Sequence, residues 1–250
     1  MIRYYKRLYF FNIYENWFEC KYGPKDLLAF NVYWHVKTKQ QKKVPMIKSI
    51  SHTVELALNL TEEEIFSKFS KQIRQQSRIA ENEGITIQFN ADPTDFINFF
   101  NEFAAKKNNS MVGKLSKDRV DIMGKQIEFC FAMYNGQVLA AHSYLVDRAT
   151  GMVRHQHSAT KRLDENFDRN LIGRANKYLT VKNILYYKEQ GYTTFDFGGY
   201  AADTTDEGLA GINKYKLLFG GDVVPSTNYH SYSYWVFKKL YKMAGLEGTN

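Results

Sequence analysis

The sequence predicts an α+β protein, because short alternating segments typical of strands are interleaved with segments whose apolar residues recur at helical intervals. From residue 85 onward the predicted order is strand, two helices, three antiparallel strands, helix, strand, helix and strand, which is an α+β pattern. The chain has 250 residues, of which 44% are hydrophobic, so it can bury a substantial core as one large domain or two small ones.

Short strands and turns are expected over residues 1–60. The segment 27–36 is strongly apolar and aromatic, and the lysine-rich segment 37–43 is expected to form an exposed loop. Residues 54–60 alternate between apolar and polar side chains, as a half-buried strand does.

One long helix is expected to follow. Thr61 and Glu64 have the spacing of a capping box, in which each residue satisfies backbone groups of the first turn. Apolar residues then recur at helical intervals until Gly84, which ends the helix. Arg74 and Arg78 lie one turn apart on this helix and therefore share a face.

Turn-forming residues punctuate the rest of the chain. Asp92 caps a helix that has Pro93 at its first position, where the fixed backbone angle of proline fits. Asn135 and Gly136 form the turn of a hairpin, and Gly191 ends a helix. The remaining elements are strands over 85–89, 127–133, 138–146, 152–158, 193–197 and within 222–234, and helices from 116, over 170–190 and 206–218, and, with a basic amphipathic pattern, over 235–244.

Charge and cysteine content narrow the function classes. The net charge of +8 is consistent with a solvated basic surface or with an anionic partner such as a nucleotide, RNA or an anionic membrane surface. Two cysteines are too few for a disulfide framework. The sequence has neither an apolar run long enough to span a membrane nor a signal-peptide pattern, so we expect a cytoplasmic protein. We find no P-loop, dinucleotide-binding fingerprint, nucleophile elbow or zinc signature.

Two glycine-rich motifs carry the functional signal. An aromatic strand with one acid runs into two glycines in Phe195-Asp196-Phe197-Gly198-Gly199, and a helix ends in a second such turn in Tyr215-Lys216-Leu217-Leu218-Phe219-Gly220-Gly221. Glycine lets a backbone approach a ligand that a side chain would exclude. A lysine just before such a turn can offset developing negative charge, as an acyl-transfer site requires.

These motifs, with the helix before residue 85, resemble those of GNAT acyltransferases, and more closely those of their Fem-type branch of peptidyl and aminoacyl transferases. The resemblance implies a GNAT-like fold, in which helices flank a mixed, mostly antiparallel sheet. It also implies two domains: residues 1–84 as a truncated N-terminal GNAT-like half with its connecting helix, and residues 85–250 as the catalytic domain.

The resemblance implies a binding site for the acyl donor. GNAT enzymes hold the coenzyme A pyrophosphate on a short turn at a helix start, and the counterpart is Asn170-Leu171-Ile172-Gly173-Arg174-Ala175. Unpaired amides at a helix start favour a phosphate, small residues at Gly173 and Ala175 permit its approach, and Arg174 adds charge. Acyl-CoA, most plausibly acetyl-CoA, is therefore the expected donor. Aminoacyl-tRNA is the alternative donor.

Four residues are candidates for the chemistry. By resemblance, Lys216 faces the donor carbonyl or leaving group, although a helix lysine can simply be solvated. Asp196 orients the acceptor amine or takes its proton, or else holds neighbouring backbone amides. Alternation puts His155 and His157 on one strand face, where either can act as a base, or else they form a polar face without a chemical role. No third metal ligand is placed beside these histidines, so no metal is expected.

The acceptor is expected to carry an amine. The family suggests an amino sugar or nucleotide-linked sugar used to build a surface polysaccharide, whose phosphates Arg74 and Arg78 could bind unless they are ordinary surface charges. The last helix could contact an anionic bilayer, giving a peripheral location at the inner membrane face, or pack on the core. A different class of function is a non-catalytic module that binds an anionic partner.

Overall fold

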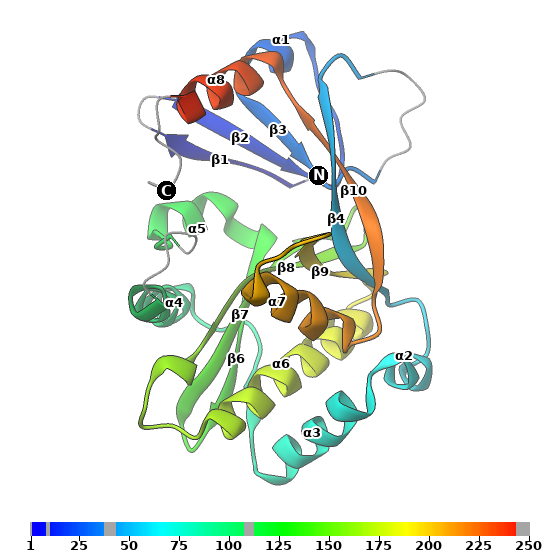
Figure 1. The fold of residues 1–250 in the computed structure, drawn as a ribbon, viewed down its shortest axis with the longest axis vertical. Coiled ribbons are helices and arrows are strands. Elements are labelled where there is room, and N and C mark those ends of the chain that lie inside the picture. The colour runs from blue at the N-terminus through cyan, green and yellow to red at the C-terminus, as the bar shows by residue number, and fades with distance from the viewer. Residues whose placement is uncertain (1, 9–10, 38–43, 108–112, 244–250) are drawn as a thin grey trace.

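The structure is a computed structural model that describes residues 2–8, 11–37, 44–107 and 113–243. Ten strands in these residues form a single sheet in the order β1-β2-β3-β10-β4-β9-β8-β7-β6-β5, and helices flank it (Figure 1). The strands pair antiparallel except for β2 with β3 and β8 with β9. The predicted α+β class, with a mixed and mostly antiparallel sheet, is confirmed.

The elements have the following bounds. The strands are β1 (Ile2–Leu8), β2 (Phe11–Trp17), β3 (Asn31–Trp34), β4 (Ile47–Ala57), β5 (Thr86–Gln88), β6 (Ile127–Tyr134), β7 (Gln137–Asp147), β8 (Met152–Thr160), β9 (Thr194–Tyr200) and β10 (Asp222–His230). The helices are α1 (Pro24–Leu28), α2 (Glu62–Lys68), α3 (Lys71–Asn82), α4 (Pro93–Lys107), α5 (Lys117–Met123), α6 (Arg169–Glu189), α7 (Glu207–Leu217) and α8 (Tyr232–Met243).

Two apolar clusters cover the two faces of the sheet. Side chains along β6 and β7 alternate between them, so that Cys130 and Tyr144 join one cluster while Phe129 and Leu145 join the other. Helices α2, α3 and α6 pack on the first cluster, and α4 and α5 pack on the second. This alternation was readable in the sequence because its period of two is local.

The single helix predicted from Thr61 to Gly84 is wrong, because two helices occupy this segment. The capping box is confirmed, since Glu64 N donates to Thr61 Oγ1 over 3.2 Å. Phe69 then adopts an extended backbone with ψ of 138°, and its buried ring lies 6.1 Å from that of Phe219. The Ser70 hydroxyl accepts from Ile73 N and starts the second helix.

The chain ends by returning to its beginning. The segment 222–234, predicted to hold one or two strands, supplies one strand, β10, which lies between β3 and β4. Figure 1 shows β4 and β10 running between the part of the sheet built from β1–β3 and the part built from β6–β9. The domain boundary at residue 84 stays a prediction.

The last helix, α8, begins three residues before its predicted start at Trp235, and residue 244 lies outside the described residues. Helix α8 lies beside α1 and exposes Trp235, Val236, Leu240 and Met243. Among the described helices, none combines the length and apolarity needed to cross a bilayer.

Candidate active site

Strands β8 and β9 open into a V at the centre of the sheet. They pair in parallel only from Met152 to Arg154 and from Thr194 to Asp196, although both strands continue beyond these residues. On its other side, β9 pairs with β4 from Thr194 to Tyr200. In the described residues, the edge of β8 from 155 to 160 therefore has no strand partner facing β9.

A cavity of about 920 Å³ lies at this opening, and we call it the β8–β9 cavity. Its walls come from β8, β9, α4, α6, α7, the segment after β8 and the end of β2. The lining residues described below are Trp17, Arg154, His155, His157, Arg162, Asn176, Gly198, Gly199, Tyr215 and Lys216. A space of this size is ample for a small-molecule ligand.

The two glycine doublets have different roles. Gly198 has a φ of +85°, and a β-carbon there would lie 3.4 Å from His155 O and 3.8 Å from Lys216 Nζ. Glycine at this position therefore keeps the wall of the cavity open. Gly220 instead approaches α2, because a β-carbon there would lie only 2.4 Å from Lys68 O. Of the two doublets, only the first lines the β8–β9 cavity.

Lys216 projects from the last turn of α7 into the β8–β9 cavity. It is half-buried, and its Nζ donates a hydrogen bond to Gly199 O. Burial, with a smaller contribution from the Arg154 charge, lowers the pKa of Lys216 to about 8, and Asp196 opposes this shift. The side chain is thus a cation near neutral pH whose charge is lost just above it.

Asp196 is fully buried and anchors the point at which β8 and β9 separate. Its carboxylate accepts hydrogen bonds from Thr53 Oγ1, Arg154 and, over 2.8 Å, Gly198 N. Burial alone would raise the pKa of Asp196, but the Arg154 charge, His35 and these hydrogen bonds hold it below its usual range. Asp196 is therefore ionised, and the bonds it accepts orient Arg154 and the turn at Gly198.

Arg154 is the cation that sequence reasoning did not single out. Its guanidinium binds Asp196 and lies 4.8 Å from the ring centre of Trp17, which comes from the N-terminal part of the sheet. The only local signal was its place directly before the two histidines of β8. Neither Asp196 nor Trp17 is near Arg154 in the sequence, so the contacts could not be foreseen.

The prediction that His155 and His157 share one strand face is wrong. The β7–β8 register shifts between them, so that His157 pairs with Ser143 and His155 pairs with Tyr144. Adjacent residues of β7 face opposite sides, and the two histidines therefore do as well. The His155 ring lies 5.0 Å from that of Tyr144, whereas the His157 ring lies 5.2 Å from that of Phe100.

Both histidines nevertheless line the β8–β9 cavity. Burial lowers the pKa of His155 well below its ordinary value, with smaller contributions from His142 and Lys216, and its Nε2 lies 3.1 Å from His157 O. Burial and the charge of Arg119 lower the pKa of His157 to about 4. The Nδ1 atom of His157 contacts Ser143 Oγ at 2.8 Å. Both rings are thus neutral near pH 7.

A buried polar chain fixes α7 against the rest of the site. His142 Nε2 lies 2.8 Å from Asn176 Oδ1, and Asn176 Nδ2 donates to Tyr215 Oη over 3.0 Å. Tyr215 also contacts Thr180 Oγ1 at 3.0 Å. Because Tyr215 directly precedes Lys216, this chain holds the lysine in register with the cavity.

The segment predicted to hold the donor pyrophosphate forms the first turns of α6. Asp168 already accepts hydrogen bonds from Asn170 N and Leu171 N over 2.9 and 3.2 Å. Arg174 binds Glu83 of the α3 end with two contacts of 2.8 and 2.5 Å, and Ala175 is fully buried.

Three of the four predicted donor-site residues still line one small cavity of about 210 Å³, which we call the α6 cavity. Its lining consists of Gln76, Arg162, Arg169, Asn170, Gly173, Arg174 and Lys177. Four of these side chains are basic, and Arg162 also lines the β8–β9 cavity. The two cavities therefore adjoin, and the assignment of Asn170, Gly173, Arg174 and Ala175 to the donor stays a prediction.

The two arginines predicted to bind the acceptor lie on α3, and neither lines the β8–β9 cavity. Arg74 donates to three carbonyls at the end of α2, with distances of 3.3 Å to Phe66 O, 3.2 Å to Ser67 O and 2.6 Å to Phe69 O. Arg78 is exposed on the same helix. Their role in binding an acceptor stays a prediction, and for Arg74 the structure adds a capping role.

One group of side chains has the composition of a metal site. Potential ligand atoms of His35, Glu55 and Asp196 lie within 4.8 Å of one another. However, Lys37 binds Glu55 and Arg154 binds Asp196, so both carboxylates already have cationic partners. His35 bridges Glu55 and Ser226 instead. These ion pairs connect β3 and β4 to the Asp196 site and would oppose a further cation.

The order of elements after β5, and the V between β8 and β9, define a GNAT-like fold, and comparison with solved structures agrees. FemX aligns with a TM-score of 0.63 at 12% identity, over 96% of this chain and 85% of FemX. L-PGS from Bacillus licheniformis aligns with a TM-score of 0.60 at 9% identity, over 99% of this chain and 86% of its own.

The C-terminal domain of a putative lysylphosphatidylglycerol synthetase from Agrobacterium fabrum gives a TM-score of 0.59 at 13% identity, covering 88% of this chain and 74% of that chain. No protein-family model matches the sequence, and no curated protein matches it significantly. At these identities the similarity establishes a shared fold, and the resemblance to the Fem-type branch found in the sequence is consistent with it.

Proposed function

We propose that this protein is an N-acyltransferase that forms an amide on the amine of an amino sugar or sugar nucleotide used in surface polysaccharide synthesis. The observation that carries this proposal is the position of the Lys216 ammonium inside the β8–β9 cavity, beside the glycine turn at Gly198 and Gly199. Transfer of an acyl group develops negative charge on the carbonyl oxygen and on the leaving group, and a desolvated cation stabilises both.

The favoured donor is an acyl-CoA such as acetyl-CoA. The free edge of β8 from 155 to 160 offers backbone groups to an extended chain that carries amides. The basic α6 cavity adjoins this edge through Arg162 and suits the donor's phosphates. The acyl carbonyl would then lie near Lys216.

The reaction balances with groups of the chain. The neutral amine of the acceptor attacks the thioester carbonyl, the C–N bond forms, and collapse of the oxyanion breaks the C–S bond. The departing thiolate takes up a proton, and the amine nitrogen gives one up. His157 is the best-placed acceptor for that proton, because Asp196 is held by Arg154, Thr53 and Gly198, and His155 contacts a backbone carbonyl.

An aminoacyl-tRNA donor is the second candidate. It is favoured by the structural similarity to FemX and to proteins named lysylphosphatidylglycerol synthetase or L-PGS. The same basic surface, with a net charge of +8, could contact RNA phosphates. The third hypothesis is a non-catalytic module that binds an anionic partner.

One set of assays distinguishes these three hypotheses. The protein is incubated with an amino-sugar nucleotide and either acetyl-CoA or aminoacyl-tRNA, and the amide product is followed by mass spectrometry. We expect product with acetyl-CoA, and a loss of ~10²–10³-fold in kcat for Lys216→Met, as for removal of an oxyanion-stabilising group. Lys214→Met is the matched control, because Lys214 is exposed on the same helix.

The outcomes point to different readings. Product only with aminoacyl-tRNA, and donor binding that weakens steeply with salt, would favour the second candidate. Binding of an anion without product from either donor would favour the non-catalytic module. Equal rates for Lys216→Met and the unmodified protein would contradict the proposed role of the lysine.

A further inference from the structure

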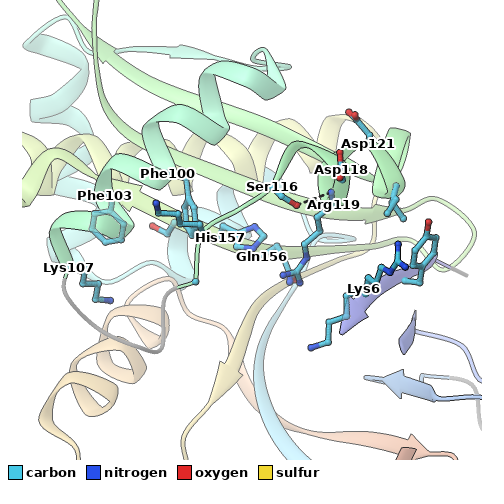
Figure 2. A pocket seen from close by; sticks show the side chains of 16 residues that line it. Lys6, Phe100, Phe103, Lys107, Ser116, Asp118, Arg119, Asp121, Gln156 and His157 are labelled. Carbon is cyan, nitrogen blue, oxygen red and sulfur yellow. Dashed lines mark hydrogen bonds between the residues drawn. The ribbon is translucent and has the colours of Figure 1, made fainter. Parts of the chain in front are cut away.

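A second large cavity adjoins the β8–β9 cavity on the side of α4 and α5. It measures about 980 Å³, and its walls come from β1, α4, α5, β8 and the segment before α5 (Figure 2). We call it the β1–α5 cavity. Five residues line both cavities: Phe103, Lys107, Gln156, His157 and Ser158. A molecule bound in the β1–α5 cavity can therefore extend past His157 toward Lys216.

Basic side chains outnumber acidic ones in the lining of the β1–α5 cavity. They are Lys6, Arg7, Lys107, Lys114 and Arg119, against the two acidic residues Asp118 and Asp121. Asp121 already has a partner, because its carboxylate lies 2.8 Å from Lys117 Nζ. Of the five basic residues, Lys6 lies 3.7 Å from Glu15. The charge balance of the wall thus favours an anionic ligand.

Arg119 is the basic residue that lies deepest in this wall. It is half-buried, and its Nε atom is buried without a hydrogen-bond partner. No carboxylate in the described part of the chain forms an ion pair with it. Its positive charge lowers the pKa values of His157 and Tyr4. Figure 2 shows its side chain descending from α5 to lie beside Gln156. A half-buried guanidinium with no acid partner among the described residues is costly unless a ligand supplies the anion.

The geometry points to the β1–α5 cavity as the binding site for the phosphate groups of the acceptor, with Arg119 as their main ligand. This inference rests on the proposed N-acyl transfer. A guanidinium presents a planar fork of donors that matches phosphate oxygens, and the flexible Lys6, Arg7 and Lys114 can complete the shell. Phe100 and Phe103 supply an apolar wall for a sugar or base ring.

The inference moves the acceptor's phosphates away from the arginines of α3. Arg74 caps the end of α2, and neither Arg74 nor Arg78 lines the β1–α5 cavity. The two basic cavities, with the β8–β9 cavity between them, give donor and acceptor phosphates separate places: the α6 cavity for the donor and the β1–α5 cavity for the acceptor. Like charges are thereby kept apart while the reacting groups meet.

Calorimetric titration of the full chain tests the inference. The probes are inorganic pyrophosphate, UDP, and phosphatidylcholine vesicles with and without phosphatidylglycerol. The vesicle arm distinguishes a lipid headgroup from a nucleoside diphosphate as the source of the phosphate. Arg119→Gln should weaken binding of the preferred probe at least ~10-fold, the usual scale for loss of one charge-assisted contact. Lys214→Gln, which alters an exposed lysine that lines none of the three cavities, is the matched control and should change this binding less than ~2-fold.

Two further variants guard against misfolding. Arg7→Gln and Lys114→Gln alter exposed side chains and should each weaken binding by a few-fold. Unchanged affinity in Arg119→Gln, or an equal loss of affinity in Lys214→Gln, would overturn the inference. Absence of acyl transfer with Arg119-dependent binding intact would count against the proposed function and leave the phosphate site standing. Normal transfer with binding unaffected by Arg119→Gln would count against the site alone.

Discussion

At the scale of single residues, the charged side chains of the site shift one another's pKa values. The negative charge of Asp196 favours the charged form of Lys216, whereas the positive charge of Arg154, which is paired with Asp196, disfavours it. Lys216 was found from the sequence because its motif is short and contiguous. Arg154 and Thr53 were missed because they reach Asp196 from positions 42 and 143 residues away, and no local pattern encodes such a contact.

The pKa of Lys216 gives a prediction about pH. A lysine whose pKa is lowered to about 8 carries its charge below that pH and loses it above. If the charge assists transfer, kcat should fall as pH rises through about 8. Lys216→Arg, which stays charged because a guanidinium does not titrate in this range, should move that decline to higher pH even if its maximal rate is lower.

The measurement is a pH–rate profile for both proteins across the alkaline range, with Lys214→Arg as the control. A decline that stays at the same pH in Lys216→Arg would assign the titration to another group, such as the amine of the acceptor. This readout is independent of the loss of rate in Lys216→Met, because it follows the position of the decline and not its height.

At the scale of elements, the strands and helices after residue 85 were predictable because their signals are local. The hairpin turn at Asn135 and Gly136 and the proline at the start of α4 each determine the backbone around them. The break between α2 and α3 was not predictable in the same way. Phe69 continues the helical apolar pattern, and it leaves the helix because its ring packs against Phe219, which lies 150 residues later.

Arg74 provides a prediction at this scale. Its guanidinium donates to three carbonyls at the end of α2, where helical partners run out, and of these Phe66 O also accepts from Phe69 N. Arg74→Met should therefore lower the free energy of unfolding by about 1 kcal/mol, the scale of a net hydrogen bond. Arg78→Met, one turn along the same helix and without such contacts, should change it by less than about 0.5 kcal/mol.

Urea unfolding of the two variants measures the difference. Steady-state kinetics of Arg74→Met then test the role predicted from the sequence, in which this arginine binds the phosphates of the acceptor. A raised KM with unchanged stability would support acceptor binding and contradict the capping role. Lower stability with KM unchanged would support the cap.

At the scale of the whole molecule, the position of the cavities follows from sheet topology. The sequence indicated a glycine-opened cleft but not its place, because the V exists only where the parallel pairing of β8 and β9 stops. That pairing joins strands separated by all of α6. The contribution of Trp17 to the cavity likewise requires the N-terminal strands to continue the same sheet through β10 and β4. Neither relation leaves a periodic signal in the sequence.

The same sheet shields three histidines on neighbouring strands, of which His142 is fully buried and His155 and His157 are half-buried, and this gives a prediction for acid stability. Burial lowers the pKa values of His142 and His157 to about 4, and that of His155 well below its ordinary value. The unfolded chain binds these protons at about pH 6.5, so between that pH and about pH 4 it holds more protons than the folded chain. Stability should therefore fall as the pH decreases through this window, by up to about 4 kcal/mol per pH unit when all three contribute.

Unfolding free energies measured in urea at pH values from neutral down to this window give the slope directly. His157→Gln removes one of the three groups, so its slope should be about one third smaller whatever its stability at neutral pH. Ser158→Ala, which alters an exposed residue of β8 that does not titrate, is the control and should leave the slope unchanged. A stability that stays flat down to about pH 5 would mean that the buried histidines take up protons without unfolding, and the neutral His157 required for proton transfer would then be lost at mildly acidic pH.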